Sequence, residues 1–331
     1  MDRVIVYPGS IPQDVDVLST NKNSLVALGM LMLDVLGSGT LASGLKCVPT
    51  SPGSLNVSIQ PGRLYSLQNI DNTAYGSLAL DSTHQILKQG ILLDALQLAC
   101  PAPSTSGFSI NYLIEAAYQD SDTSATALPY YNSQNPQQPF SGPNNTGVAQ
   151  PTVRQGSIVL QAKPGSVAPT GTQNTPTPDV GFTGLWVVSV ANGQSAITTS
   201  NIAMASGAPF LTGSFAGAYT GYSGSITSSI NWWRLGPAVY LTLAPVTGTS
   251  NGSGFGISNL PPAICPPTTQ LISVPNAAFV NNGAALGGVA DVSAQVSASG
   301  LSFQFNNSLT GWTASSSKGI GAEVTFSYVL A

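Results

Sequence analysis

The sequence is poor in charge. Only 7% of its 331 residues are charged, with 9 lysine and arginine side chains against 13 aspartate and glutamate side chains. An ordinary soluble domain carries about 25% charged residues. Nine scattered cations cannot form the basic stripe that a nucleic acid duplex requires, so we expect no nucleic acid partner. Few groups are left for acid–base catalysis, and the composition favours an interaction or structural protein over an enzyme.

Cysteine and histidine are scarce as well. The three cysteines, Cys47, Cys100 and Cys265, lie far apart and form no CxxC pair, so neither a disulfide framework nor a zinc site is expected. We expect small buried side chains in a protein made in a reducing cytoplasm, with no metal and no cofactor. The single histidine, His84, is expected to cap or pack a turn.

Long apolar runs are missing too. The longest, residues 25–36, spans about 12 residues and contains Asp34, against the ~20 residues that a membrane span needs. We therefore expect no insertion into a membrane. The first residues carry neither a long apolar region nor a small-residue cleavage site, and no signal peptide is expected.

Apolar residues and turn residues are abundant instead. Hydrophobic residues make up 42% of the chain, which also has 35 glycines and 24 prolines. Short β-type runs between turn residues predict a mainly β fold with one short helix. The clearest strands are expected at residues 55–59, 110–118, 158–160 and 185–188. Long polar loops at residues 119–150 and 164–183 are expected to be functional or to pack on another chain.

The helix is predicted near residues 20–36. Residues 19–23 supply capping side chains, residues 24–36 are rich in leucine, methionine and alanine, and Gly37 provides a stop. Apolar residues lie on more than one side of this helix, so it must be covered nearly all round. The interpretation is a helix that packs on its own sheet on one side and on sister subunits on the other. A helix buried within its own domain fits equally well. The expected oligomer interface consists of Leu25, Leu28, Met32 and Leu36.

The chain is predicted to form two domains. We expect an N-terminal β-rich domain at residues 1–197, a linker at residues 198–209, and a C-terminal antiparallel β-sandwich at residues 210–331. Strands of the C-terminal part alternate cleanly between apolar and polar residues, as in a half-buried sheet. The apolar sets are Val239, Leu241 and Leu243, then Leu301, Phe303 and Phe305, then Val324, Phe326, Tyr328 and Leu330.

Two short motifs match catalytic or metal-binding patterns, but the residues around each do not fit that chemistry. Residues 248–252 match GxSxG, but no helix-forming sequence follows and His84 lies upstream. Residues 120–124 have the opening spacing of a calcium loop, but Ala125 stands where the loop needs glycine. We expect no enzyme activity.

Two adjacent tryptophans carry more information. If Gly236 and Pro237 form a two-residue hairpin turn, Trp232 pairs with Leu241 on the core face, and Trp233 pairs with Tyr240 on the opposite face. Paired aromatics on an outer face suggest a carbohydrate or protein contact, or a subunit interface. Cross-strand packing under a loop of the same domain is the alternative.

These patterns resemble a known family. The likeness of the C-terminal part rests on residues 211–215, 232–243, 245–251, 260–261 and 318–321, and on the strand with Phe326, Tyr328 and Leu330. The likeness of the N-terminal part rests on residues 7–9, the helix, and residues 128–132 and 153–156. The first set looks like the distal β-sandwich of tail fibre and baseplate receptor-binding proteins of tailed bacteriophages. The second set is similar to their baseplate-attached domains.

The resemblance implies a viral tail protein located in the virion at the tail tip or baseplate and made in the host cytoplasm. It implies a homotrimer whose N-terminal domain attaches to other tail or baseplate proteins. The C-terminal domain would bind a bacterial surface polysaccharide, pilus or outer-membrane protein, with Trp233 and Tyr240 as candidate receptor-binding residues. The alternative is a structural baseplate or fibre adaptor with no receptor contact.

Overall fold

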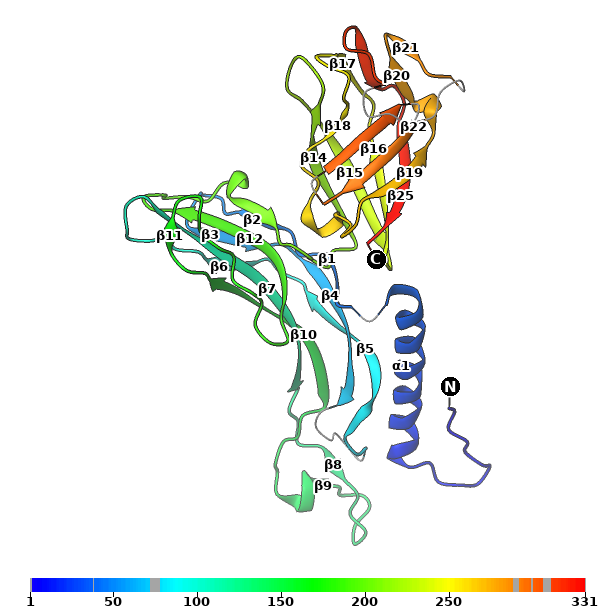
Figure 1. Ribbon diagram of the computed structural model, residues 1–331. Helices are drawn as coiled ribbons and strands as arrows, with labels where there is room; N and C mark the ends of the chain where they lie inside the picture. The colour runs from blue at the N-terminus through cyan, green and yellow to red at the C-terminus, as the bar shows by residue number, and fades with distance from the viewer. Residues whose placement is uncertain are drawn as a thin grey trace.

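The fold is mainly β, as the sequence predicts. A computed structural model describes residues 2–37, 39–71, 78–287, 292–298, 300–305 and 311–330. All strand pairs within its sheets are antiparallel. Helix α1 stands at one side, an N-terminal half of curved sheets lies beside it, and a C-terminal half lies at one end of both (Figure 1).

Helix α1 is longer than predicted and begins earlier. It spans Asp14–Leu36, so the expected capping residues 19–23 lie inside it. The cap is Gln13, whose backbone N–H donates to Asp16 Oδ2 at 2.8 Å. This reciprocal box uses Gln13 and Asp16 in place of the usual serine or threonine with glutamate, which is why the sequence pattern did not reveal it. The end is as predicted, since Gly37 follows the helix with φ +82°.

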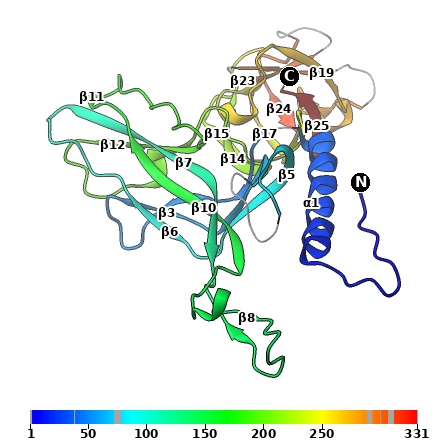
Figure 2. The ribbon, with the colours of Figure 1, turned by 90° about the horizontal axis from the view of Figure 1, so that it is seen from below.

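The described residues of the N-terminal half form four sheets. The first sheet has the strand order β1(Leu41–Gly44), β4(Gly62–Asp71), β5(Asp81–Leu92). The second sheet has the strand order β10(Val153–Pro164), β7(Phe108–Thr123), β12(Thr183–Ala191), β13(Ile202–Met204), and the short strand β11(Ala168–Pro169) also pairs with β7. Smaller sheets are β2(Cys47–Pro49), β3(Asn56–Ile59), β6(Leu96–Ala99), and β8(Pro129–Tyr130) with β9(Phe140–Ser141). The β8–β9 hairpin projects away from the body in both views (Figures 1 and 2). It lies within the predicted long loop 119–150.

The predicted linker, residues 198–209, is part of the N-terminal half. It contains β13, which pairs with β12, and Ala205 and Ala208 are buried. The backbone of Ala42 then bonds to Pro209 and Leu211 on either side of Phe210. The low-complexity segment thus contains small residues that are buried in the N-terminal half. The boundary between the two halves therefore lies after Phe210.

The described residues of the C-terminal half form two sheets. The larger has the order β19(Gln270–Val274), β22(Val292–Ser297), β23(Gly300–Phe305), β18(Gly256–Ile257), β14(Thr212–Thr220), β15(Ile226–Leu235), β16(Ala238–Leu243), β25(Val324–Val329). The smaller has the order β17(Val246–Thr249), β24(Ser317–Ile320), β20(Phe279–Asn281), β21(Ala284–Ala285). The predicted alternation is present, since Val239, Leu241 and Leu243 are all fully buried.

An aromatic core joins these two sheets. Phe279 of the smaller sheet lies 5.1 Å, between ring centroids, from Phe303 of the larger one. Phe255 stacks at 4.8 Å on Phe303, and Trp312 meets Phe255 at 5.2 Å edge to face. These spacings are typical of favourable aromatic pairs. The C-terminal half therefore has the expected sandwich of antiparallel sheets, and its buried residues belong to one core cluster that continues into the N-terminal half.

The larger sheet curls until its first and last strands meet. Gln270 of β19 uses its side-chain amide in place of a strand ladder: Nε2 donates to the carbonyl of Val329 at 2.5 Å, and Oε1 accepts from the Val329 N–H at 3.2 Å. One glutamine side chain thus satisfies both backbone groups of Val329 on β25.

Helix α1 packs on the N-terminal half through a narrow contact with β5. Gly29 is its one buried residue, and a Cβ there would stand 3.0 Å from Ile86 Cα. Leu25, Met32 and Leu36 are half-buried, whereas Leu28 is 47% exposed. The four residues predicted to share an oligomer interface are thus split between a half-buried group and an exposed one. Leu25 faces the helix's own hairpin, where it lines a hollow with Ile70 and Ile86.

An ion pair also ties the helix to its hairpin. Lys22 of α1 pairs with Asp81 at the start of β5, and Asp81 Oδ1 accepts from the backbone N–H groups of Thr83 and His84. Lys22 and these N–H groups hold the pKa of Asp81 well below its usual value. His84 contacts the same carboxylate through Nδ1 at 2.9 Å from within β5, whereas the sequence predicts that it caps or packs a turn.

We predict that Asp81→Asn weakens the docking of α1 in a pH-dependent way. Asparagine keeps the Oδ1 acceptor for the turn but loses the charge that pairs with Lys22. A carboxylate with a lowered folded-state pKa contributes stability above its unfolded pKa of about 3.8 and loses it as the pH falls further. At pH 7 the variant should melt about 1–3 °C lower than the wild type in a calorimetric scan, and the difference in melting temperature should narrow below pH 3.8.

Asp94→Asn, at an exposed carboxylate near the other end of β5, is the control and should show no such difference. A gap that stays constant down to pH 2 contradicts the prediction.

Candidate aromatic surface and charged cluster

The predicted hairpin is present with the predicted register. Trp232 pairs with Leu241, Trp233 with Tyr240, and Leu235 with Ala238. Gly236 has φ +54°, which suits the first position of the tight turn and which residues with a side chain rarely adopt. The sequence is sufficient here because turn chemistry and alternation agree.

The two tryptophans lie on opposite faces, as expected. Trp232 is 2% exposed, whereas Trp233 is 43% exposed. The rings of Trp233 and Tyr240 are parallel, with 3.8 Å between centroids and 3° between planes. This stack fixes two rings on the outer face of the larger sheet without help from the core. The structure thus brings the two candidate receptor-binding residues together.

Hydroxyl and amide groups surround this aromatic pair. Strand pairing places two cross-strand rows on the outer face: Thr212, Trp233, Tyr240 and Ser327, and beside them Ser214, Asn231, Thr242 and Thr325. The hydroxyl oxygens of Thr242 and Thr325 lie 2.9 Å apart and bond to one another. We call these two rows the aromatic–hydroxyl face. No residue in it is charged, and its groups can stack on, donate to and accept from a ligand.

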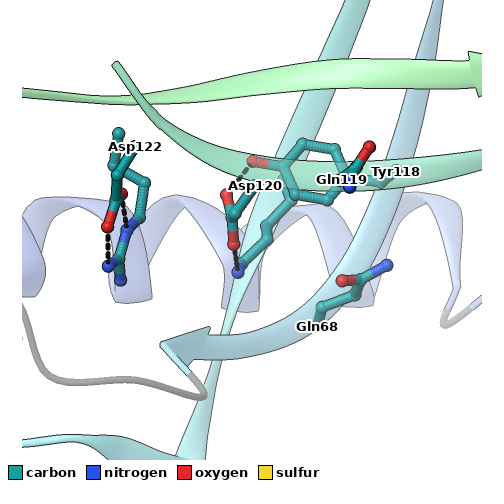
Figure 3. Close-up of a pocket in the computed structure, with 7 residues that line it drawn as sticks. Gln68, Tyr118, Gln119, Asp120 and Asp122 are labelled. Carbon is teal, nitrogen blue, oxygen red and sulfur yellow. Dashed lines mark hydrogen bonds and ion pairs between the residues drawn. The ribbon is translucent and has the colours of Figure 1, made fainter. Parts of the chain in front are cut away.

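A charged cluster lies between α1, β5 and β7–β10 (Figure 3). Asp120 lies between two donors, Lys88 and the hydroxyl of Tyr118, the latter at 2.5 Å. Arg154 binds Asp122 in a bidentate manner, Nε to Oδ1 at 2.7 Å and Nη2 to Oδ2 at 2.9 Å. Its Nη1 donates to Asp71 at 2.6 Å. A hollow of about 330 Å³ is lined by Lys88, Tyr118, Asp120, Asp122 and Arg154, together with Gln68 and Gln119.

The cluster joins elements of the N-terminal half. Arg154 holds the pKa of Asp122 below its usual value, and burial, followed by Asp120, raises that of Tyr118 above its usual value. Each carboxylate in the hollow is engaged by a cation, Asp120 by Lys88 and Asp122 by Arg154. Sequence reading missed the cluster because it noted residues 120–124 only as a calcium pattern. The positions of Lys88 and Arg154 depend on long-range strand packing.

The GxSxG match is structural. Ser250 is buried, and its hydroxyl oxygen lies 2.8 Å from the carbonyl of Gly252 and 2.7 Å from that of Thr313. It therefore acts as a turn brace and is not exposed to a substrate. Among the described residues, no group of three or more histidine, cysteine, aspartate or glutamate side chains could hold a metal ion.

A buried cation, Lys318, and a half-buried one, Arg234, in the C-terminal half were not foreseen. Lys318 is fully buried and donates to the carbonyls of Gly252, at 2.5 Å, and Gly254. Burial lowers its pKa from the usual value, and burial also lowers that of Arg234. Carbonyl oxygens thus replace a counter-ion for Lys318, which pins β24 to the loop that precedes β18.

Comparison with known proteins identifies no family. No protein-family model matches the chain, and no curated protein matches it significantly. Within the part of the chain that the structure describes, no helix has the length and apolar character needed to cross a membrane.

We predict unequal losses of stability for substitutions of the two adjacent tryptophans. Trp232→Ala removes a core ring and should lower the free energy of unfolding by roughly 3–5 kcal/mol. Trp233→Ala removes a half-exposed ring and one stacking partner, and should cost about 1–2 kcal/mol. Urea denaturation followed by far-ultraviolet circular dichroism measures both. An equal loss of stability in the two variants would contradict burial on one face only.

Proposed function

We propose that this protein is a tail-tip or baseplate protein of a bacteriophage virion that binds a receptor on the bacterial surface and initiates adsorption. The observation that carries the proposal is the aromatic–hydroxyl face. It presents a preformed Trp233–Tyr240 stack, 3.8 Å between centroids, within two rows of uncharged side chains. The protein acts by binding and not by catalysis.

Rigid exposed aromatics are suited to recognition. Truncating such a residue at the centre of an interface commonly costs 2 kcal/mol or more of binding free energy. Because Trp233 and Tyr240 already stack on one another, little rotamer entropy remains to be lost when a partner binds. The neighbouring hydroxyl groups supply hydrogen bonds to a polar ligand.

Assembly as a homotrimer is supported by the free side of α1. The helix stands beside β5, with its other side directed away from the sheets in both views (Figures 1 and 2). Val17, Leu28, Leu31 and Val35 are 70%, 47%, 58% and 47% exposed. At about 100° per residue they fall within a sector of about 60°, which we call the apolar stripe. Two further copies of the chain are the proposed cover, and the N-terminal half is the proposed attachment to other tail proteins.

The tail-tip function is tested on virions of the phage that carries this gene. An antibody raised against the purified protein should place immunogold at the tail tip in electron micrographs, and purified protein added before infection should lower the plaque count. Gold at the tail tip with an unchanged plaque count selects the structural adaptor instead. Gold elsewhere, or no gold, contradicts both functions.

The trimer is tested through the apolar stripe. Light scattering should give a mass of about 101 kDa, three times the 33.7 kDa of one chain. Leu31→Glu places a charge on the stripe and should shift the protein toward monomer with its circular dichroism unchanged, because Leu31 is exposed within one chain. Met30→Glu is the matched control, since Met30 is 46% exposed but lies about 100° away on the helix. A wild-type mass of one chain, or equal dissociation by both variants, contradicts the proposed interface.

A further inference from the structure

A groove lies where the N-terminal half meets the C-terminal half. Its volume is about 500 Å³, within the range of about 300–1,000 Å³ that small-molecule sites occupy. From the N-terminal half it is lined by Gly44, Lys46, Trp186, Met204 and Phe210, and from the C-terminal half by Thr212, Gly213, Ser214, Asn231, Trp232 and Trp233. We call it the junction groove. It overlaps the aromatic–hydroxyl face, with which it shares Thr212, Ser214, Asn231 and Trp233.

The aromatic walls of the junction groove are held in place from behind. The indole nitrogen of Trp186 donates to the carbonyl of Leu45 at 2.8 Å, and its ring lies 5.1 Å from that of Phe210. Trp233 is fixed on the other side by its stack on Tyr240. Flat rings that are already oriented can accept the C–H face of a ligand with little further ordering.

The Trp232 ring forms part of the floor of the groove. Gly213 pairs with Trp232, and a Cβ at Gly213 would stand 2.6 Å from the Trp232 ring, so the missing side chain leaves room for this ring. Trp232 is 2% exposed, and its Nε1 is buried without a hydrogen-bond partner among the described residues. The contribution of Trp232 to the floor is therefore an apolar ring surface.

The polar groups of the groove fit a ligand rich in hydroxyls. Thr212, Ser214 and Asn231 are exposed and share the outer face of β14 and β15, where each can donate and accept. Lys46 is the single charged residue in the described lining, which contains no carboxylate. The charge of the groove therefore suits a neutral ligand or, better, one with a single negative group.

We propose that the junction groove binds an oligosaccharide, preferably one that carries an acidic sugar beside Lys46. The oligosaccharide would be the receptor that the proposed tail-tip function requires. The biological meaning of the inference therefore rests on that proposed function. Sugar rings offer apolar C–H faces to Trp186 and Trp233 and hydroxyls to Asn231 and its neighbours. A lipid would leave these polar groups unpaired, and a basic peptide would meet the charge of Lys46.

The test uses tryptophan fluorescence of the full-length protein. Three of the four tryptophans line the groove, while Trp312 lies in the sandwich core. Three trisaccharides serve as probes at millimolar concentrations. The first consists of a neutral hexose, the second of an N-acetylhexosamine and the third of a uronic acid. We expect a saturable change in emission, strongest with the uronic acid probe. No change with any of the three probes overturns the proposal.

Paired variants locate the response. Asn231→Ala should weaken binding of the responding trisaccharide by roughly tenfold, and Lys46→Met should remove the preference for the uronic acid probe. Ser229→Ala is the matched control, because Ser229 lies two residues before Asn231 on the exposed face of β15 but outside the groove. Equal weakening by Ser229→Ala and Asn231→Ala, or a response unchanged by Asn231→Ala, overturns the groove as the site.

The outcomes separate this site from the proposed function. Plaque competition by the purified protein without any saccharide response keeps the tail-tip function and overturns the saccharide groove. A saccharide response that Asn231→Ala weakens, without plaque competition or tail-tip gold, keeps the groove and overturns the tail-tip function.

Discussion

The register of β15 against β16 determines what the C-terminal half can present. Side chains alternate along a strand, so a slip of one residue would exchange its two faces. Trp233 would then enter the core, and Trp232 would stand at the surface. Gly236 and Pro237 fix the register through the turn, and the pairing continues outward to β14 and β25. The aromatic stack, the hydroxyl rows and one wall of the junction groove all follow from this single alignment.

Sequence reasoning succeeds where the determinants are local and fails where they are distant. The 236–237 turn and the alternating strands beside it lie within about a dozen residues, so both faces of the hairpin could be predicted. The start of α1 was missed because Gln13 and Asp16 form an unusual cap. The junction groove could not be predicted at all. It combines Lys46, Trp186 and Asn231, which come together only through the docking of the two halves.

The few charges are unevenly distributed. The ion pairs of the described residues all lie in the N-terminal half, where Lys22, Lys88 and Arg154 connect α1, β5, β7 and β10. The sequence from residue 210 onward contains only four charged residues, and the cations among them, Arg234 and Lys318, are at least half-buried. Electrostatics thus holds the N-terminal elements to one another. The C-terminal half relies on apolar packing and on hydrogen bonds, among them those that the buried Lys318 donates to backbone carbonyls.

The meeting of β19 and β25 has a consequence for a protein held in several copies at one place. An open sheet ends in unpaired N–H and C=O groups that can recruit a strand from a neighbouring molecule. Gln270 occupies the backbone groups of Val329 on the last strand of the larger sheet. Val329 therefore has no free backbone groups to offer to a strand of a neighbouring copy, even at a high local concentration.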